Sequence, residues 1–175
     1  GNPDGNWFPW LAEELEKLGH SVVRPLLPTP EGQTPENWVR IIGEHAEKLG
    51  GDLIVVAHSM SPMAVCHYLA IRTTPVHACF FVSGFAQFSG TIEPFATLNP
   101  PFCEKTIDWI IVRKNCSKFI CFAGGDDPYV SLDVSRDFAN TLGAEFIVIK
   151  NGGHLNADSG FTQFPQLLAR IKAEL

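Results

Sequence analysis

Residues Asp52 to Ala64 read Asp-Leu-Ile-Val-Val-Ala-His-Ser-Met-Ser-Pro-Met-Ala, and this stretch decides the fold that we expect. Its aliphatic run, Leu53 to Val56, suits an interior strand of a parallel sheet, buried on both faces. The next residues follow the pattern small–any–Ser–any–small, which is typical of a nucleophile elbow between a strand and a helix. Ala57 and Ser61 are the small residues around Ser59. The stretch therefore predicts a sharp turn that presents Ser59, with an ordinary turn and a buried serine as the alternative.

Strands and helices are predicted to alternate along the whole chain. Apolar runs predict strands at Ser21–Leu26, His77–Ser83, Lys118–Ala123 and Glu145–Ile149. Helical spacing predicts helices at Trp7–Leu18, Thr34–Leu49, Pro62–Ile71, Glu104–Lys114, Leu132–Leu142 and Phe161–Leu175. This alternation indicates one α/β domain over residues 1–175, with a mostly parallel sheet between two helix layers. In such a sheet, functional residues are expected at the carboxyl ends of the strands.

The composition excludes several classes of partner. The chain has 175 residues, 45% of them apolar, and a net charge of −6 without a cluster of basic residues. We therefore expect no nucleic-acid or membrane partner and infer no obligate protein partner. The five cysteines include no Cys-x-x-Cys pair, so neither a disulfide framework nor a zinc site is expected. A cytoplasmic location fits these thiols, and no glycine-rich nucleotide motif predicts a cofactor.

A base and a carboxylate follow Ser59 in the order expected for an elbow enzyme. Asp126 and Asp127 come after the predicted strand Lys118–Ala123, and His154 comes after Glu145–Ile149. Serine needs a histidine base, and the base needs an orienting carboxylate, so His154 is the expected base. Asp126 and Asp127 compete for the carboxylate role, and Asp127 is favoured because Pro128 holds its backbone extended. The other aspartate should cap the loop.

Neighbouring residues complete the predicted site. The backbone N–H of Met60 should bind the oxyanion, with a second donor from a loop whose tail is residues 1–5. His58 should point away from Ser59 and pack or hydrogen-bond beneath the site. The long connection over residues 84–102 should line or cover an apolar acyl pocket with aromatic side chains, namely Phe85, Phe88 and Phe95.

Several motifs together resemble the retinoblastoma-binding-protein-nine/YdeN family of small serine hydrolases, within the α/β-hydrolase superfamily. The resemblance rests on Asn6–Leu11, Val56–Met60, Val82–Ala86, Asp126–Pro128, Gly152–His154 and Gly160–Thr162. It implies an α/β-hydrolase fold and a triad of Ser59, Asp127 and His154 that cleaves esters or related acyl bonds. Ser61-Pro62 departs from the family pattern, which has glycine after the nucleophile.

A second departure lies at the N-terminus. The family opens with a strand whose place in the sheet is between Ser21–Leu26 and Leu53–Ala57, and the sequence contains no such strand before Asn6. Its absence would leave backbone groups unpaired inside the sheet. We expect roughly 10 further residues before Gly1 in the natural protein, a strand and the start of a loop, or another segment or chain in this gap.

The predicted function is hydrolysis of a small-molecule acyl substrate through an acyl-serine intermediate. The same triad would serve an amidase or peptidase, because leaving-group preference depends on pocket shape. The alternative from another class is a binding module that keeps the fold without catalysis.

Overall fold

A computed structural model describes residues 2–88, 90–91 and 93–175 of the chain. Gly1 of the predicted oxyanion loop, and Ser89 and Ile92 of the predicted 84–102 connection, lie outside the described residues. The helices are α1 (Phe8–Glu16), α2 (Pro35–Leu49), α3 (Ser61–Ile71), α4 (Phe95–Leu98), α5 (Pro100–Glu104), α6 (Trp109–Lys114), α7 (Leu132–Leu142) and α8 (Pro165–Lys172). The strands are β1 (Ile54–His58), β2 (Val76–Val82), β3 (Cys116–Gly124) and β4 (Glu145–Ile149), and a 3-10 turn covers Ala157–Ser159.

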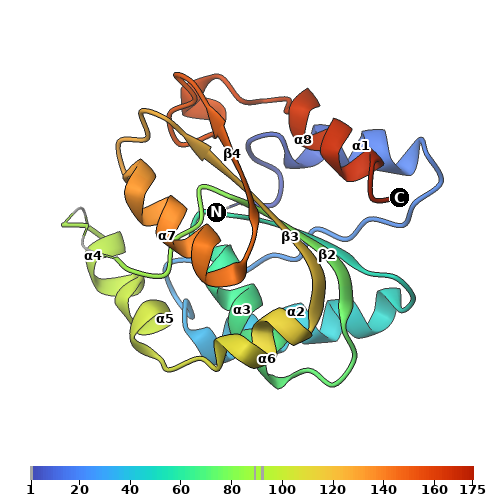
Figure 1. The fold of residues 1–175 in the computed structure, drawn as a ribbon, viewed down its shortest axis with the longest axis horizontal. Helices are drawn as coiled ribbons and strands as arrows, with labels where there is room; N and C mark the ends of the chain where they lie inside the picture. The colour runs from blue at the N-terminus through green and yellow to red at the C-terminus, as the bar shows by residue number, and fades with distance from the viewer. Residues whose placement is uncertain (1, 89, 92) are drawn as a thin grey trace.

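The four strands form one parallel sheet in the order β1-β2-β3-β4. In Figure 1, α1 and α8 lie side by side near one face of the sheet, and α2, α3, α6 and α7 lie toward the other. The predicted α/β class, a parallel sheet with helices on both faces, is therefore confirmed. All four strands point the same way, so their carboxyl ends meet at one edge of the molecule.

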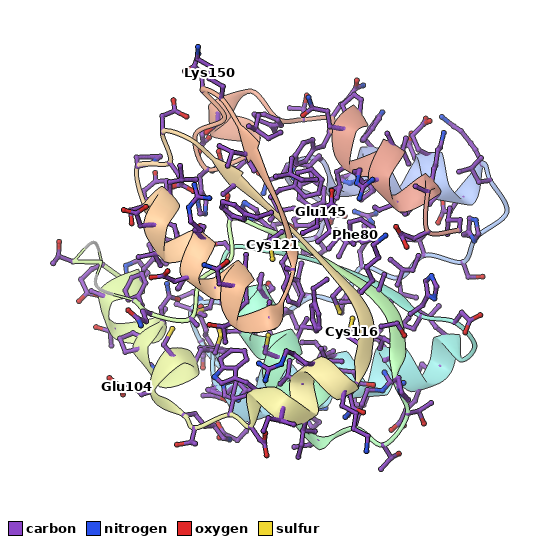
Figure 2. The ribbon with its side chains drawn as sticks, viewed as in Figure 1. Phe80, Glu104, Cys116, Cys121, Glu145 and Lys150 are labelled. Atoms are coloured by element: carbon purple, nitrogen blue, oxygen red, sulfur yellow. The ribbon has the colours of Figure 1, made fainter. Side chains whose placement is uncertain are left out.

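Two hydrophobic cores cover the two faces of the sheet. Phe80, Ile120 and Phe122 pack with Trp7 and side chains of α8, and Figure 2 shows Phe80 between the sheet and these helices. Residues one position along the strands, such as Phe81 and Cys121, pack instead with α3 and α7. This alternation follows from the two-residue period of a strand. Burial on both faces makes β2 and β3 a rigid support for the loops that follow them.

Helix α2 begins with a side-chain cap where the sequence predicts its start. The Oγ1 atom of Thr34 accepts the N–H of Asn37, and Pro35 occupies the first position of α2. The predicted helix over Glu104–Lys114 is only partly correct, because α5 ends at Glu104 and α6 starts at Trp109. Asp108 caps α6 by accepting two backbone N–H groups, so the predicted helix begins at Trp109 and not at Glu104.

The predicted strand Ser21–Leu26 is wrong. No residue of this segment belongs to a helix or strand, since an extended backbone becomes a strand only by pairing with a neighbour. Together with β1 it lines a cavity of about 800 Å³.

β1 pairs with β2 on one side, and within the described ranges no strand pairs with its other side. The sheet thus does not close directly onto residues 21–26. The expectation that a further strand belongs beside β1 stays a prediction.

Across the described ranges, we find no helix with the length and apolar character needed to cross a bilayer.

Candidate active site

Ser59 occupies a sharp turn between β1 and α3, as the elbow pattern predicts. Its φ angle is +63°, in the left-handed region that non-glycine residues rarely adopt. The turn is held by the Ser59 N–H, which donates to the Val82 carbonyl at 2.9 Å. Strain of this kind persists only where surrounding contacts hold it, and it is common at functional sites. The geometry raises the Ser59 hydroxyl above the carboxyl ends of β1 and β2.

The structure brings Ser59, His154 and Asp127 into one chain of hydrogen bonds. The Nε2 atom of His154 lies 3.1 Å from the Ser59 Oγ atom. Its other ring nitrogen, Nδ1, lies 2.8 Å from the Oδ2 atom of Asp127. A carboxylate can only accept, so Nδ1 carries a hydrogen and Nε2 is left to accept from the serine hydroxyl. Three loops that follow three different strands supply these side chains, as chain order predicts.

Asp127 is held rigidly in its orientation. Its Oδ1 atom accepts the N–H groups of Tyr129 at 2.9 Å and Val130 at 3.1 Å, which leaves Oδ2 for His154. Burial raises the pKa of the Asp127 carboxyl, but the hydrogen bond from His154 and the two backbone donors outweigh it. The net pKa lies below the ordinary value, so the group is ionised at neutral pH.

Asp126 points elsewhere and takes the loop-capping role. Its Oδ1 atom accepts the N–H of Gly153 at 2.8 Å, immediately before His154 in the chain. The two competing aspartates therefore contact the same histidine loop at different places. Asp127 reaches the ring of His154, and Asp126 reaches the backbone beside it.

The loop that carries His154 approaches the sheet very closely. A β-carbon on Gly124 would lie 1.9 Å from the Gly153 carbonyl oxygen, so only glycine fits at the end of β3. Gly153 itself has a φ of +51°. Beyond it, the His154 N–H donates to the Ser159 Oγ atom at 3.1 Å. The two glycines let the base come within reach of Ser59.

His58 hydrogen-bonds beneath the site, as predicted. Its Nε2 atom lies 2.8 Å from the carbonyl oxygen of His154, and the two imidazole rings are 4.8 Å apart. Burial, followed by the nearby His154, lowers the pKa of His58 to about 3. The ring is therefore neutral near pH 7. Sequence reasoning missed Ser83, whose Oγ atom donates to the same carbonyl at 3.2 Å. Its place directly after β2 was the available signal.

Met60 begins the turn into α3, with its N–H beside Ser59. In the part of the chain that the structure describes, no acceptor pairs with this N–H. It is free to bind an oxyanion next to the Ser59 hydroxyl, which matches its predicted place. For the second donor, the structure places Asn2, Pro3 and Asn6 on the wall of the same cavity. The identity of that donor stays a prediction.

The predicted aromatic residues lie on the cavity that opens at Ser59. This cavity of about 800 Å³ is lined by Phe85, Phe88 and Phe95, together with Met60 and His154. Phe85 is buried and its ring lies 5.6 Å from that of Phe88, so the two form one apolar wall. An apolar group attached to a carbonyl at Ser59 would find space there.

Metal ligation has no candidate in the described residues, where no group of three His, Cys, Asp or Glu side chains could hold an ion. All five cysteines are free thiols.

Comparison with known proteins gives one family and several related folds. A family model described as serine hydrolase matches residues 1–173. No curated protein matches the sequence. Among solved structures, the ydeN gene product of B. subtilis aligns with a TM-score of 0.87 and 24% identity, covering 99% of this chain and 92% of that one.

Two further structures extend the likeness. A hydrolase of the alpha/beta superfamily from Xanthomonas campestris has a TM-score of 0.70 and 15% identity, covering 99% of this chain and 93% of that one. Esterase PE8 has a TM-score of 0.53 and 14% identity, covering 80% of this chain and 60% of that one. At these identities the likeness shows a shared α/β-hydrolase fold.

Proposed function

The chain belongs to the serine hydrolase family, and from that premise we propose that it cleaves small-molecule carboxylic esters through an acyl-serine intermediate. The observation that carries the proposal is the continuous hydrogen-bonded chain from Ser59 through His154 to Asp127, with distances of 3.1 and 2.8 Å. The esterase among the structures of similar fold supports the same reaction class.

In the first half of the reaction, Ser59 attacks the substrate carbonyl carbon. His154 takes the hydroxyl proton at Nε2 as the bond from Oγ to carbon forms. Ionised Asp127 accepts the Nδ1–H and stabilises the imidazolium. The Met60 N–H donates to the oxyanion of the tetrahedral intermediate. As the intermediate collapses, His154 returns the proton to the alcohol oxygen, and the alcohol leaves.

In the second half, water replaces the alcohol. His154 removes one proton from the water, whose oxygen attacks the acyl carbon. The acid leaves when the bond to Ser59 breaks and His154 returns the proton to Oγ. In this proposal, the wall of Phe85 and Phe88 holds the acyl chain, with Phe95 at the more exposed side of the cavity.

Five free thiols suit a reducing compartment, so we place the reaction in the cytoplasm. The proposal needs no cofactor, no nucleic acid, no membrane and no second protein. Its substrate is a small acyl compound.

A fluorophosphonate probe tests the proposal directly, because it phosphonylates only an activated serine. We expect labelling of the wild-type protein and none of Ser59→Ala. Ser117→Ala is the matched control, since Ser117 is exposed at the start of β3 and far from the elbow in the fold. Equal labelling of wild type and Ser59→Ala would remove Ser59 from this role.

The two alternatives give different results in a substrate screen. An esterase hydrolyses p-nitrophenyl esters, an amidase or peptidase also cleaves the matching anilides, and a binding module cleaves neither. Acyl chains from two to twelve carbons, together with aminoacyl esters, would define the acyl preference.

A further inference from the structure

The carbonyl oxygen of His154 accepts hydrogen bonds from two side chains. His58 Nε2 approaches it at 2.8 Å and Ser83 Oγ at 3.2 Å. His58 is the last residue of β1, and Ser83 directly follows β2. These two strands are paired, with His58 opposite Val82. The backbone of the expected base is therefore fastened to two neighbouring strand ends, one of which also leads into Ser59.

The contact with the His154 carbonyl fixes which ring nitrogen of His58 carries the hydrogen. A carbonyl oxygen accepts and never donates, so His58 carries its hydrogen on Nε2. With the ring neutral near pH 7, that hydrogen is the only one it can donate. The basic nitrogen is then Nδ1, which makes no hydrogen bond to Ser59 in the described residues, and burial lowers the pKa of His58 to about 3, so His58 is no substitute base for Ser59.

The placement of Ser83 is also specific. It is fully buried, and its φ of +50° is unusual for a residue with a side chain. Its N–H donates to the Phe122 carbonyl at 2.8 Å, which ties the residue to β3 as well as β2. The strained backbone conformation accompanies a hydroxyl directed at the His154 carbonyl rather than toward solvent.

We propose that His58 and Ser83 are positioning residues that hold the His154 backbone so that its ring stays within hydrogen-bond reach of Ser59. The inference rests on the proposed function and adds two residues to it. Neither residue transfers a proton in this proposal. Their effect is on geometry, because small displacements of a base from its nucleophile lower the rate of the chemical step.

Two variants of His58 separate the hydrogen bond from the shape of the ring. His58→Phe keeps a planar ring without a donor, whereas His58→Gln keeps an N–H donor at a similar reach. With a p-nitrophenyl ester, we expect His58→Phe to lower kcat about tenfold, the scale of one hydrogen bond. KM should stay within about twofold, and His58→Gln should recover most of kcat.

Ser83→Ala tests the second donor to the His154 carbonyl independently of His58. It removes one of the two donors, so kcat should fall less than in the double variant His58→Phe/Ser83→Ala. The double loss should exceed the product of the single losses, because only then is the buried carbonyl left without either side-chain donor. His77→Phe is the matched control, since His77 lies on β2 at the opposite end of the sheet.

A measurement without substrate keeps this inference separate from the proposed function. The ¹H–¹⁵N resonance of the His154 Nδ1–H reports its hydrogen bond to Asp127. We expect His58→Phe to shift or broaden this resonance, and His58→Gln and His77→Phe to leave it in place. That result supports positioning even if wild type cleaves no ester. Equal kcat and an unchanged resonance in folded His58→Phe would overturn the proposal, as would His58→Gln behaving like His58→Phe.

Discussion

The Oδ1 atom of Asp126 accepts the N–H of Gly153 at 2.8 Å, one residue before the expected base. Its neighbour Asp127 binds the ring of that base instead. Two adjacent carboxylates thus act on one loop, and substitution should separate their contributions.

Asp127→Asn should lower kcat by about a thousandfold or more, because an amide in that place favours the wrong tautomer of His154. Asp126→Asn keeps an acceptor oxygen for the Gly153 N–H, so its kcat should fall by less than about tenfold. Ester hydrolysis at pH 7 measures both. Equal losses in the two variants would contradict the assigned division between the aspartates.

Stability should depend on pH through Asp127. Its pKa in the folded protein lies below the ordinary value of 3.8, so the ionised carboxylate stabilises the fold. This contribution is fully present above the ordinary value and is lost as pH falls through the lower folded pKa. Urea unfolding of wild type and Asp127→Asn should therefore show a difference in unfolding free energy that shrinks below about pH 4. A constant difference from pH 7 to pH 2 would argue against the shift.

Gly153 should not tolerate a side chain. Its φ is +51°, and an added β-carbon would lie 2.3 Å from the Ser159 Oγ atom. Gly153→Ala should therefore cost about 2–3 kcal/mol of unfolding free energy and lower kcat, because Ser159 also binds the His154 N–H. Gly143→Ala is the control: φ is +67° but the space is open, so only about 1 kcal/mol is expected, without loss of activity. Urea unfolding and ester hydrolysis check both, and equal effects would contradict the steric explanation.

Phe88 should influence acyl-chain preference. It lines the cavity at Ser59, and its ring packs at a tilt against that of Phe85. Phe88→Ala should enlarge the apolar cavity and so make room for a longer acyl chain. We expect it to raise the ratio of kcat/KM for octanoyl over acetyl esters by about tenfold. Phe146→Ala, on β4 and away from this cavity, should cost stability while leaving the ratio unchanged. A ratio that Phe88→Ala leaves unchanged would place the acyl chain elsewhere.

Much of the site could be predicted from the sequence because its parts follow strand ends. Ser59, Asp127 and His154 each come directly after an apolar run, and parallel strands bring such positions to one edge. Chain order then distinguishes His154 from the other histidines, because it alone follows Asp127 in the sequence. The sequence favours Asp127 over Asp126 through Pro128, but the contact that each carboxylate makes needed coordinates, because adjacent residues on one loop differ in the direction of their side chains.

The parts that sequence reasoning missed depend on contacts between distant segments. Ser83 donates to the His154 carbonyl across 71 residues, and its place after β2 marks it as a residue of the site edge without indicating this partner. The segment Ser21–Leu26 has the composition of a strand, yet a strand exists only where a neighbour pairs with it. Local propensity is therefore a weaker guide for such a segment than for β2 or β3, which are buried between partners.

The fluorescence of Trp7 can report on the loop that carries His154, because Trp7 contacts the next residue, Leu155. Its buried indole donates from Nε1 to the Leu155 carbonyl at 2.8 Å, and its ring lies 6.1 Å from that of His58. A variant with Phe at Trp10, Trp38 and Trp109 would leave this indole as the single tryptophan chromophore. Its fluorescence emission would then change if the Leu155 carbonyl moved away from the indole N–H. The emission would therefore report movement of the segment that carries His154 as it occurs.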